Sequence, residues 1–153
     1  MPRAHSTIIL KKSDILFVWA EEMLAHLDAG AVVQADRTIF QNLEAFCHLV
    51  AHSIKLNEKV YLIFLRELQT IEASAERDRV FDFKPFYKHL IRASKDFSAS
   101  MENRLELKVD VLNNSLFAGI VNYFRGFNTS DGLEQRMIDI VSICLYGIHS
   151  ADK

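Results

Sequence analysis

The chain has 153 residues, half of them hydrophobic and a quarter charged, with a formal net charge of −2 at pH 7. This length is enough for one domain with a substantial core, and the weak charge excludes an extended basic surface for nucleic acid or anionic membranes. No apolar run reaches the length of a membrane span and no signal peptide opens the chain, so we expect a single cytoplasmic domain. The two cysteines, Cys47 and Cys144, fall on apolar helix faces and are expected to be buried free thiols.

The first two predicted helices are indicated by apolar residues that recur with the period of an α-helix. The first begins near Ser13, a good N-cap residue, and ends at Gly30. The second is capped by Asp36 and runs to about Lys55. Its apolar residues form one clean stripe, which predicts a single face against the core.

The third predicted helix is capped by Asn57, and residues 60–65 are apolar on every side of it. A helix of this kind is expected to be central and covered on most sides. Residues 72–79 are charged without a stripe, which predicts a loop or a frayed helix end. The fourth helix starts near Pro85, a residue that suits a first helical turn, and its apolar stripe reaches Leu105.

Two helices joined by a short turn, over residues 111–125 and 133–148, close the chain. Only a narrow strip of the first is polar, whereas an ordinary surface helix has a narrow apolar stripe. We infer an all-α bundle of about six helices whose last two pair with a second copy to form a four-helix bundle. The residues predicted for this dimer interface are Leu112, Ser115, Leu116, Gly119, Ile120, Tyr123, Met137, Val141, Cys144 and Leu145. The small residues Ser115 and Gly119 are expected where the helices approach most closely.

Three segments resemble the C-terminal ligand-binding and dimerisation domain of TetR/AcrR-family transcriptional regulators. Lys-Ser-Asp-Ile-Leu at 12–16 resembles the start of the helix that follows the family's DNA-binding unit, and Val-Tyr-Leu-Ile-Phe-Leu-Arg-Glu-Leu at 60–68 is similar to a segment ending in Leu-Arg-Glu-Leu. The closing helix pair resembles the family's dimerisation helices. The likeness spans residues 11–148, and the helix-turn-helix has no counterpart. It implies a homodimeric regulatory domain that binds a small apolar molecule and acts on DNA only through an N-terminal domain that is absent here.

Aromatic side chains on the inward stripes of the second to fourth helices predict an apolar ligand cavity with a few polar groups to orient the ligand. The alternative is that these side chains are ordinary core residues. His89, Gln69 and Asn113 are the predicted polar contacts. The complete predicted lining is Phe46, Tyr61, Phe64, Gln69, Phe86, His89, Leu90, Phe97, Asn113 and Phe117.

Glu44, His48 and His52 share one side of the second helix at spacings of four, which would bring two imidazoles to one metal ion. That side lies opposite the apolar stripe, which favours a solvated face. The sequence contains no nucleophile elbow, phosphate loop or dinucleotide fingerprint, so we expect neither an enzyme nor a bound cofactor or metal. A metal-binding or enzymatic helical bundle and a ligand-free protein-interaction module remain the alternatives to a regulatory domain.

Overall fold

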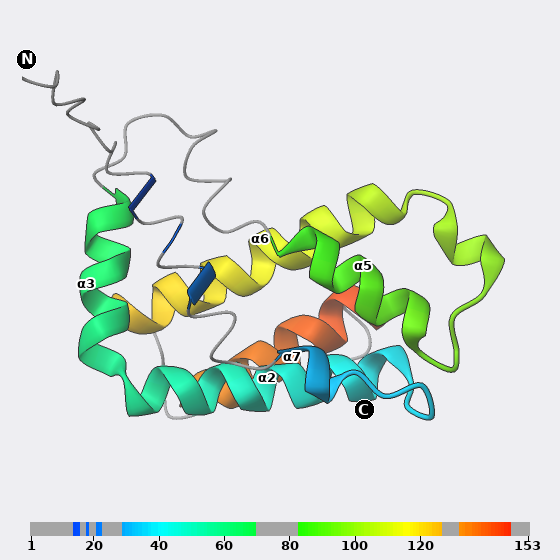
Figure 1. Cartoon of the computed structure of the whole chain (residues 1–153), viewed down its shortest axis with the longest axis horizontal. Coiled ribbons are helices and arrows are strands. Elements are labelled where there is room, and N and C mark those ends of the chain that lie inside the picture. The colour runs from blue at the N-terminus through cyan, green and yellow to red at the C-terminus, as the bar shows by residue number, and fades with distance from the viewer. Residues whose placement is uncertain are drawn as a thin grey trace, which may run out of the picture.

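The computed structural model describes residues 14–15, 18, 21–22, 29–69, 83–126 and 132–147. Within these ranges every regular element is a helix, which confirms the all-α prediction (Figure 1). Most of the predicted first helix, over residues 13–30, lies outside them. The elements are the 3-10 helix η1 (Ala29–Val32), α2 (Ile39–Leu56), α3 (Glu58–Gln69), α5 (Lys84–Ala93), the 3-10 helix η2 (Ala99–Glu102), α6 (Leu105–Phe124) and α7 (Gly132–Tyr146).

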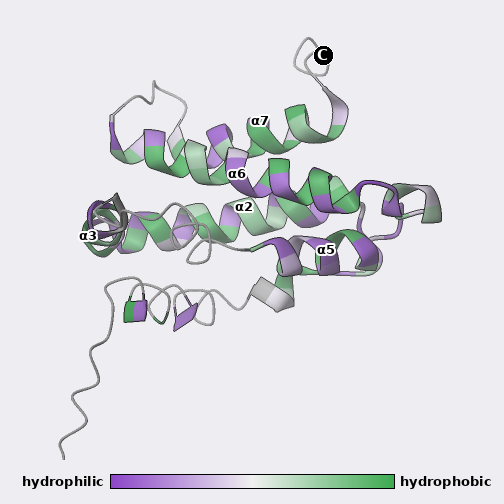
Figure 2. Ribbon diagram, turned by 90° about the horizontal axis from the view of Figure 1, so that it is seen from above, coloured by the Kyte–Doolittle hydropathy of each residue, from purple (hydrophilic) through white to green (hydrophobic). Residues whose placement is uncertain are grey.

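Four helices surround the core of the bundle. α2 and α6 run along its length, and α7 and α5 lie on opposite sides of them (Figures 1 and 2). α7 packs against both α2 and α6, and α5 packs chiefly against α6. The predicted stripe of α2 is confirmed, because Leu43, Phe46 and Ile54 are almost completely buried. Leu116 of α6 and Val141 of α7 meet it from the other side of the core.

The N-terminus of α2 lies two residues later than the sequence predicted. Asp36 is in a turn, and Thr38 is the cap residue. The Thr38 hydroxyl accepts a hydrogen bond from the backbone N–H of Gln41 (3.1 Å), and the Gln41 side chain accepts one from the backbone N–H of Thr38 (3.0 Å). This reciprocal capping box satisfies two donors that the first helical turn would otherwise leave unpaired.

The predicted fourth helix is wrong in its extent, because the chain leaves the helix at Ser94 and forms η2 before α6 begins at Leu105. Ser94 adopts an extended backbone (φ −79°, ψ 148°), and its hydroxyl donates to the carbonyl of Leu90 (2.7 Å). α6 therefore begins six residues before the predicted start at residue 111. Local periodicity continued through the break because the apolar residues of η2 happen to keep the helical spacing.

The prediction that α3 is central is also wrong. α3 stands across one end of the bundle rather than inside it (Figure 1). Phe64 and Leu65 are buried, but Val60 and Ile63 are 41% and 52% exposed. Only Asn57 separates α2 from α3, so the chain turns directly across the end of α2 and one side of α3 stays on the surface.

Candidate functional site

An aromatic cluster joins α2 to α5 inside the bundle. The ring of Phe46 on α2 lies 4.9 Å from that of Phe86 and 5.7 Å from that of Tyr87, and the two α5 rings are 5.9 Å apart. Separations and tilts of this kind are favourable for aromatic pairs. The structure thus brings together two of the residues predicted to line a cavity, Phe46 and Phe86, and adds Tyr87.

Tyr87 differs from its neighbours because it carries a polar group into this cluster. Its side chain is 2% exposed. Within the part of the chain that the structure describes, no hydrogen bond reaches its hydroxyl. A buried polar group without a partner costs roughly 1–3 kcal/mol, so such groups in folded proteins call for an explanation. Burial, with a smaller effect from Cys47, raises the pKa of Tyr87, so the hydroxyl stays protonated and can donate a hydrogen bond.

Cys47 is the second buried polar group near this cluster. Burial, reinforced by the carboxylates of Glu44 and Glu134, raises the pKa of its thiol to about 12. The nucleophilic form of cysteine is the thiolate, so this thiol is not suited to nucleophilic catalysis at neutral pH. Cys47 is therefore a small, weakly polar residue beside the cluster and not a reactive group.

Asn113 has a structural role at the position where a ligand contact was predicted. Its side chain is 8% exposed, and its Oδ1 accepts a hydrogen bond from the backbone N–H of Phe83 (3.3 Å). Because Phe83 precedes α5, this bond ties the start of α5 to α6. Asn113 thus holds one wall of the aromatic cluster in place.

The remaining predicted lining residues do not form one site. His89 is exposed, so its prediction as an inward polar contact is wrong, because it lies on the outer side of α5. The side chain of Gln69 lies outside the described residues. Phe64 is buried on α3, apart from the main core, and Tyr61 shares a hydrogen bond with Ser53 (3.1 Å). Leu90 is buried in the main core, and Phe97 and Phe117 are half-buried.

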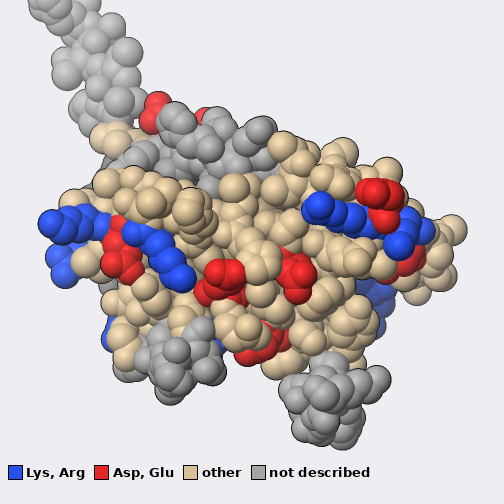
Figure 3. Space-filling view, turned by 90° about the horizontal axis from the view of Figure 1, so that it is seen from below, with Lys and Arg blue, Asp and Glu red and all other residues tan. Residues whose placement is uncertain are grey.

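The side of α2 that carries Glu44, His48 and His52 faces α7 in part. His48 Nδ1 pairs with the Glu134 carboxylate of α7, while His52 is exposed. Figure 3 shows the molecule from below, where basic side chains gather toward the two ends and acidic side chains lie both beside them and in the middle. No group of three or more His, Cys, Asp or Glu in the described ranges could hold a metal ion. The arrangement gives no support to the metal-binding alternative.

Several residues predicted for a dimer interface lie in the core of a single chain. Leu112, Leu116, Met137 and Val141 are at most 3% exposed. A Cβ atom at Gly119 would lie 2.6 Å from Cδ1 of Ile140, so the close helix approach predicted there is between α6 and α7 of one chain. These five residues are corrected from interface to core, because α7 folds back onto the face of α6 that was expected to be free. Ser115, Ile120, Tyr123 and Leu145 are half-buried, which leaves Cys144 as the one exposed residue of that predicted set.

The outward side of α6 and α7 nevertheless carries exposed apolar side chains. Val111 is 47% exposed, Ile143 44% and Tyr146 63%. Cys144 is exposed rather than buried as predicted, and its thiol is hydrogen-bonded to Ser115. Both cysteines are free, which confirms that prediction.

No helix in the described residues is long and apolar enough to cross a membrane. The chain matches no protein-family model, and no curated protein or solved structure matches it. The described residues therefore form a helical bundle in which the Tyr87 hydroxyl is enclosed beside an aromatic cluster.

Proposed function

We propose that this chain is a regulatory domain that binds a small apolar molecule between α2 and α5, as the C-terminal half of TetR/AcrR-family regulators does. The observation that carries the proposal is the buried hydroxyl of Tyr87, which has no hydrogen-bond partner among the described residues. A site with apolar walls and one well-placed polar group is typical of small-molecule recognition. The ligand would be an apolar body with one hydrogen-bond acceptor, such as a carbonyl oxygen, because Tyr87 is a protonated donor.

The domain is proposed to act as a cytoplasmic homodimer. Two free thiols are in keeping with a reducing compartment. Residues 111–124 of α6 contain no charged side chain, and Val111 and Ile143 are exposed on the outward side of α6 and α7. A two-fold interface brings each residue near its own copy, so a charge-free helix surface avoids self-repulsion, and the centres of such interfaces are depleted of charge.

α6 would connect ligand binding to a change in the dimer. It packs against α5, which carries Tyr87, and against α7, which carries the exposed Ile143. A ligand that binds one arrangement of α5 more tightly would shift the population of dimer geometries. Contact with DNA would fall to a separate domain.

Two probes of similar size test the ligand proposal. Acetophenone has a carbonyl acceptor and ethylbenzene has none, so the proposal predicts that acetophenone raises the melting temperature more, by mass action. In Tyr87→Phe the advantage of acetophenone should disappear. If neither probe stabilises the wild-type protein at millimolar concentration, the site is ordinary core and the protein-interaction alternative is favoured.

Sedimentation velocity at micromolar concentration tests the dimer. Val111→Glu should give monomers, because the two-fold axis would bring like charges together. Ile63→Glu is the matched control, since Ile63 is equally exposed but lies on α3. A monomeric wild-type protein would contradict this part of the proposal.

A further inference from the structure

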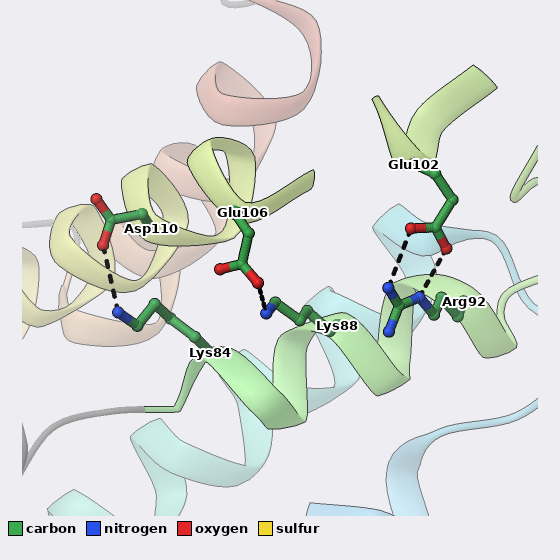
Figure 4. A network of polar contacts seen from close by, with 6 residues as sticks. All are labelled: Lys84, Lys88, Arg92, Glu102, Glu106 and Asp110. Carbon is green, nitrogen blue, oxygen red and sulfur yellow. Dashed lines mark hydrogen bonds and ion pairs between the residues drawn. The ribbon is translucent and has the colours of Figure 1, made fainter. Parts of the chain in front are cut away.

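A ladder of three ion pairs joins α5 to η2 and α6 (Figure 4). Basic residues spaced four apart along α5 pair with acidic residues that are also spaced four apart, in the opposite order along the chain. The pairs are Lys84 with Asp110 (3.7 Å), Lys88 with Glu106, and Arg92 with Glu102 (2.7 Å). The matched spacing fixes the register of α5 along its neighbours.

All three pairs lie at the surface. The Glu106 side chain is 76% exposed, and those of Arg92 and Glu102 are 50% and 45% exposed. Exposed ion pairs hold their partners weakly, and salt screens them. The three ion pairs on this side of α5 are therefore contacts that are easily broken.

The C-terminal end of α5 is attached differently. Asn42 donates to the Ser94 hydroxyl (2.9 Å), and both side chains are buried. The backbone N–H of Lys95 donates to the Arg37 carbonyl (2.9 Å), and the Asp96 carboxylate accepts from the backbone N–H of Ile39 (2.8 Å). These bonds do not depend on an opposite charge, so salt has little effect on them. At the other end, the Phe83–Asn113 bond is long, at 3.3 Å.

We propose that α5 is a gate that swings away from α6 about the turn at Ser94 and opens the aromatic cluster to ligand. The motion would break the surface ladder and the Phe83–Asn113 bond while the hydrogen bonds around Ser94 stay formed. It would separate Tyr87 and Phe86 from Phe46, which stays on α2. The role of the gate rests on the proposed ligand-binding function, whereas the motion itself does not.

Amide hydrogen exchange of the ligand-free protein tests the gate. Raising NaCl from about 0.05 M to about 1 M shortens the screening length to about 3 Å and should speed exchange of the α5 amides several-fold. Glu106→Lys should do the same at low salt, because it places like charges at the centre of the ladder. Combining it with Lys88→Glu should restore wild-type protection. The exposed position of Glu106 means that Glu106→Lys should fold normally.

The Lys95 amide and those of α2 are the internal reference and should not change. Glu134→Gln is the matched control, because it breaks a partly exposed ion pair on the opposite side of α2. The gate is refuted if neither salt nor Glu106→Lys changes the exchange rate of the α5 amides. It is also refuted if Glu134→Gln raises that rate as much as Glu106→Lys does. It is also refuted if the Lys95 amide accelerates together with α5, since the whole segment would then detach. Because no ligand is present, this result is independent of the probe experiment.

Discussion

Asn42 of α2 donates a hydrogen bond of 2.9 Å to the hydroxyl of Ser94, although 52 positions separate the two residues in the sequence. Every polar atom at this contact is satisfied. Asn42 Oδ1 accepts from the backbone N–H of Gln34 (3.0 Å), its Nδ2 also donates to the Gln34 carbonyl (3.1 Å), and Ser94 donates to Leu90. One amide side chain therefore holds the segment before α2 and the end of α5 together.

Replacing Asn42 with leucine should lower the free energy of unfolding by about 2–4 kcal/mol, because the buried Ser94 hydroxyl would lose its donor and the partly buried Gln34 backbone would lose two hydrogen bonds. Urea unfolding measures this change. Asn114→Leu is the control, since Asn114 is exposed on α6. Equal stabilities of the two variants would show that the buried network contributes little.

Gly119→Phe should destabilise the folded chain by roughly 1–3 kcal/mol, because overpacking would force α6 and α7 apart. Gly119→Ala should cost much less, since the nearest atom is the mobile end of the Ile140 side chain. The loss measured by urea unfolding should not depend on protein concentration, because the contact lies within one chain. A strong concentration dependence would place Gly119 in an interface instead.

Arg104→Gly should raise the free energy of unfolding by about 1 kcal/mol. Arg104 precedes α6 with φ +60°, a left-handed conformation that disfavours any residue with a Cβ atom. Arg104→Ala removes the same charge and keeps the strain, so it should give no gain. Thermal unfolding measures the stability of both variants. If the two variants are equally stable, the backbone at Arg104 is not strained.

Acidification should weaken the attachment of α5. Arg92 holds the pKa of Glu102 below its usual value of 4.5, and Lys88, with smaller effects from Lys84 and Arg92, does the same for Glu106. A lowered folded-state pKa means that the stabilisation is complete above the unfolded-state value and is lost as the pH falls through the folded-state value. Glu106→Gln should therefore differ from wild type in α5 hydrogen exchange at pH 6, and the difference should shrink as the pH falls through the lowered pKa of Glu106. A difference that does not shrink on acidification would exclude the ionised carboxylate as the cause.

Periodicity predicted the helical fold and the buried stripe of α2, since residues such as Leu43 and Ile54 point inward wherever the helix packs on a core. It could not locate the break at Ser94, because that break depends on Asn42, a partner remote in sequence. It also could not show which side of α6 would be covered by α7 of the same chain. An apolar stripe indicates that one face of a helix is buried, but it does not show which element covers that face.

The candidate site was predicted only in part, for a related reason. The inward positions of Phe46 and Phe86 follow from their spacing, and the structure confirms that they meet. The sequence could not distinguish Tyr87 from an ordinary core aromatic, because its significance depends on whether its hydroxyl has a partner. The high pKa of Cys47 likewise depends on its burial in the folded core, with smaller effects from Glu44 and from Glu134 of α7.

The unfolding free energy of ligand-free Tyr87→Phe shows whether the Tyr87 hydroxyl is available to a ligand. We expect this variant to be at least as stable as wild type, because the substitution removes a buried hydroxyl that has no hydrogen-bond partner among the described residues. Tyr61→Phe, which loses the bond to Ser53, should be less stable and is the matched control. If Tyr87→Phe destabilises the ligand-free protein as much as Tyr61→Phe does, the hydroxyl already has a partner and the proposed site is wrong.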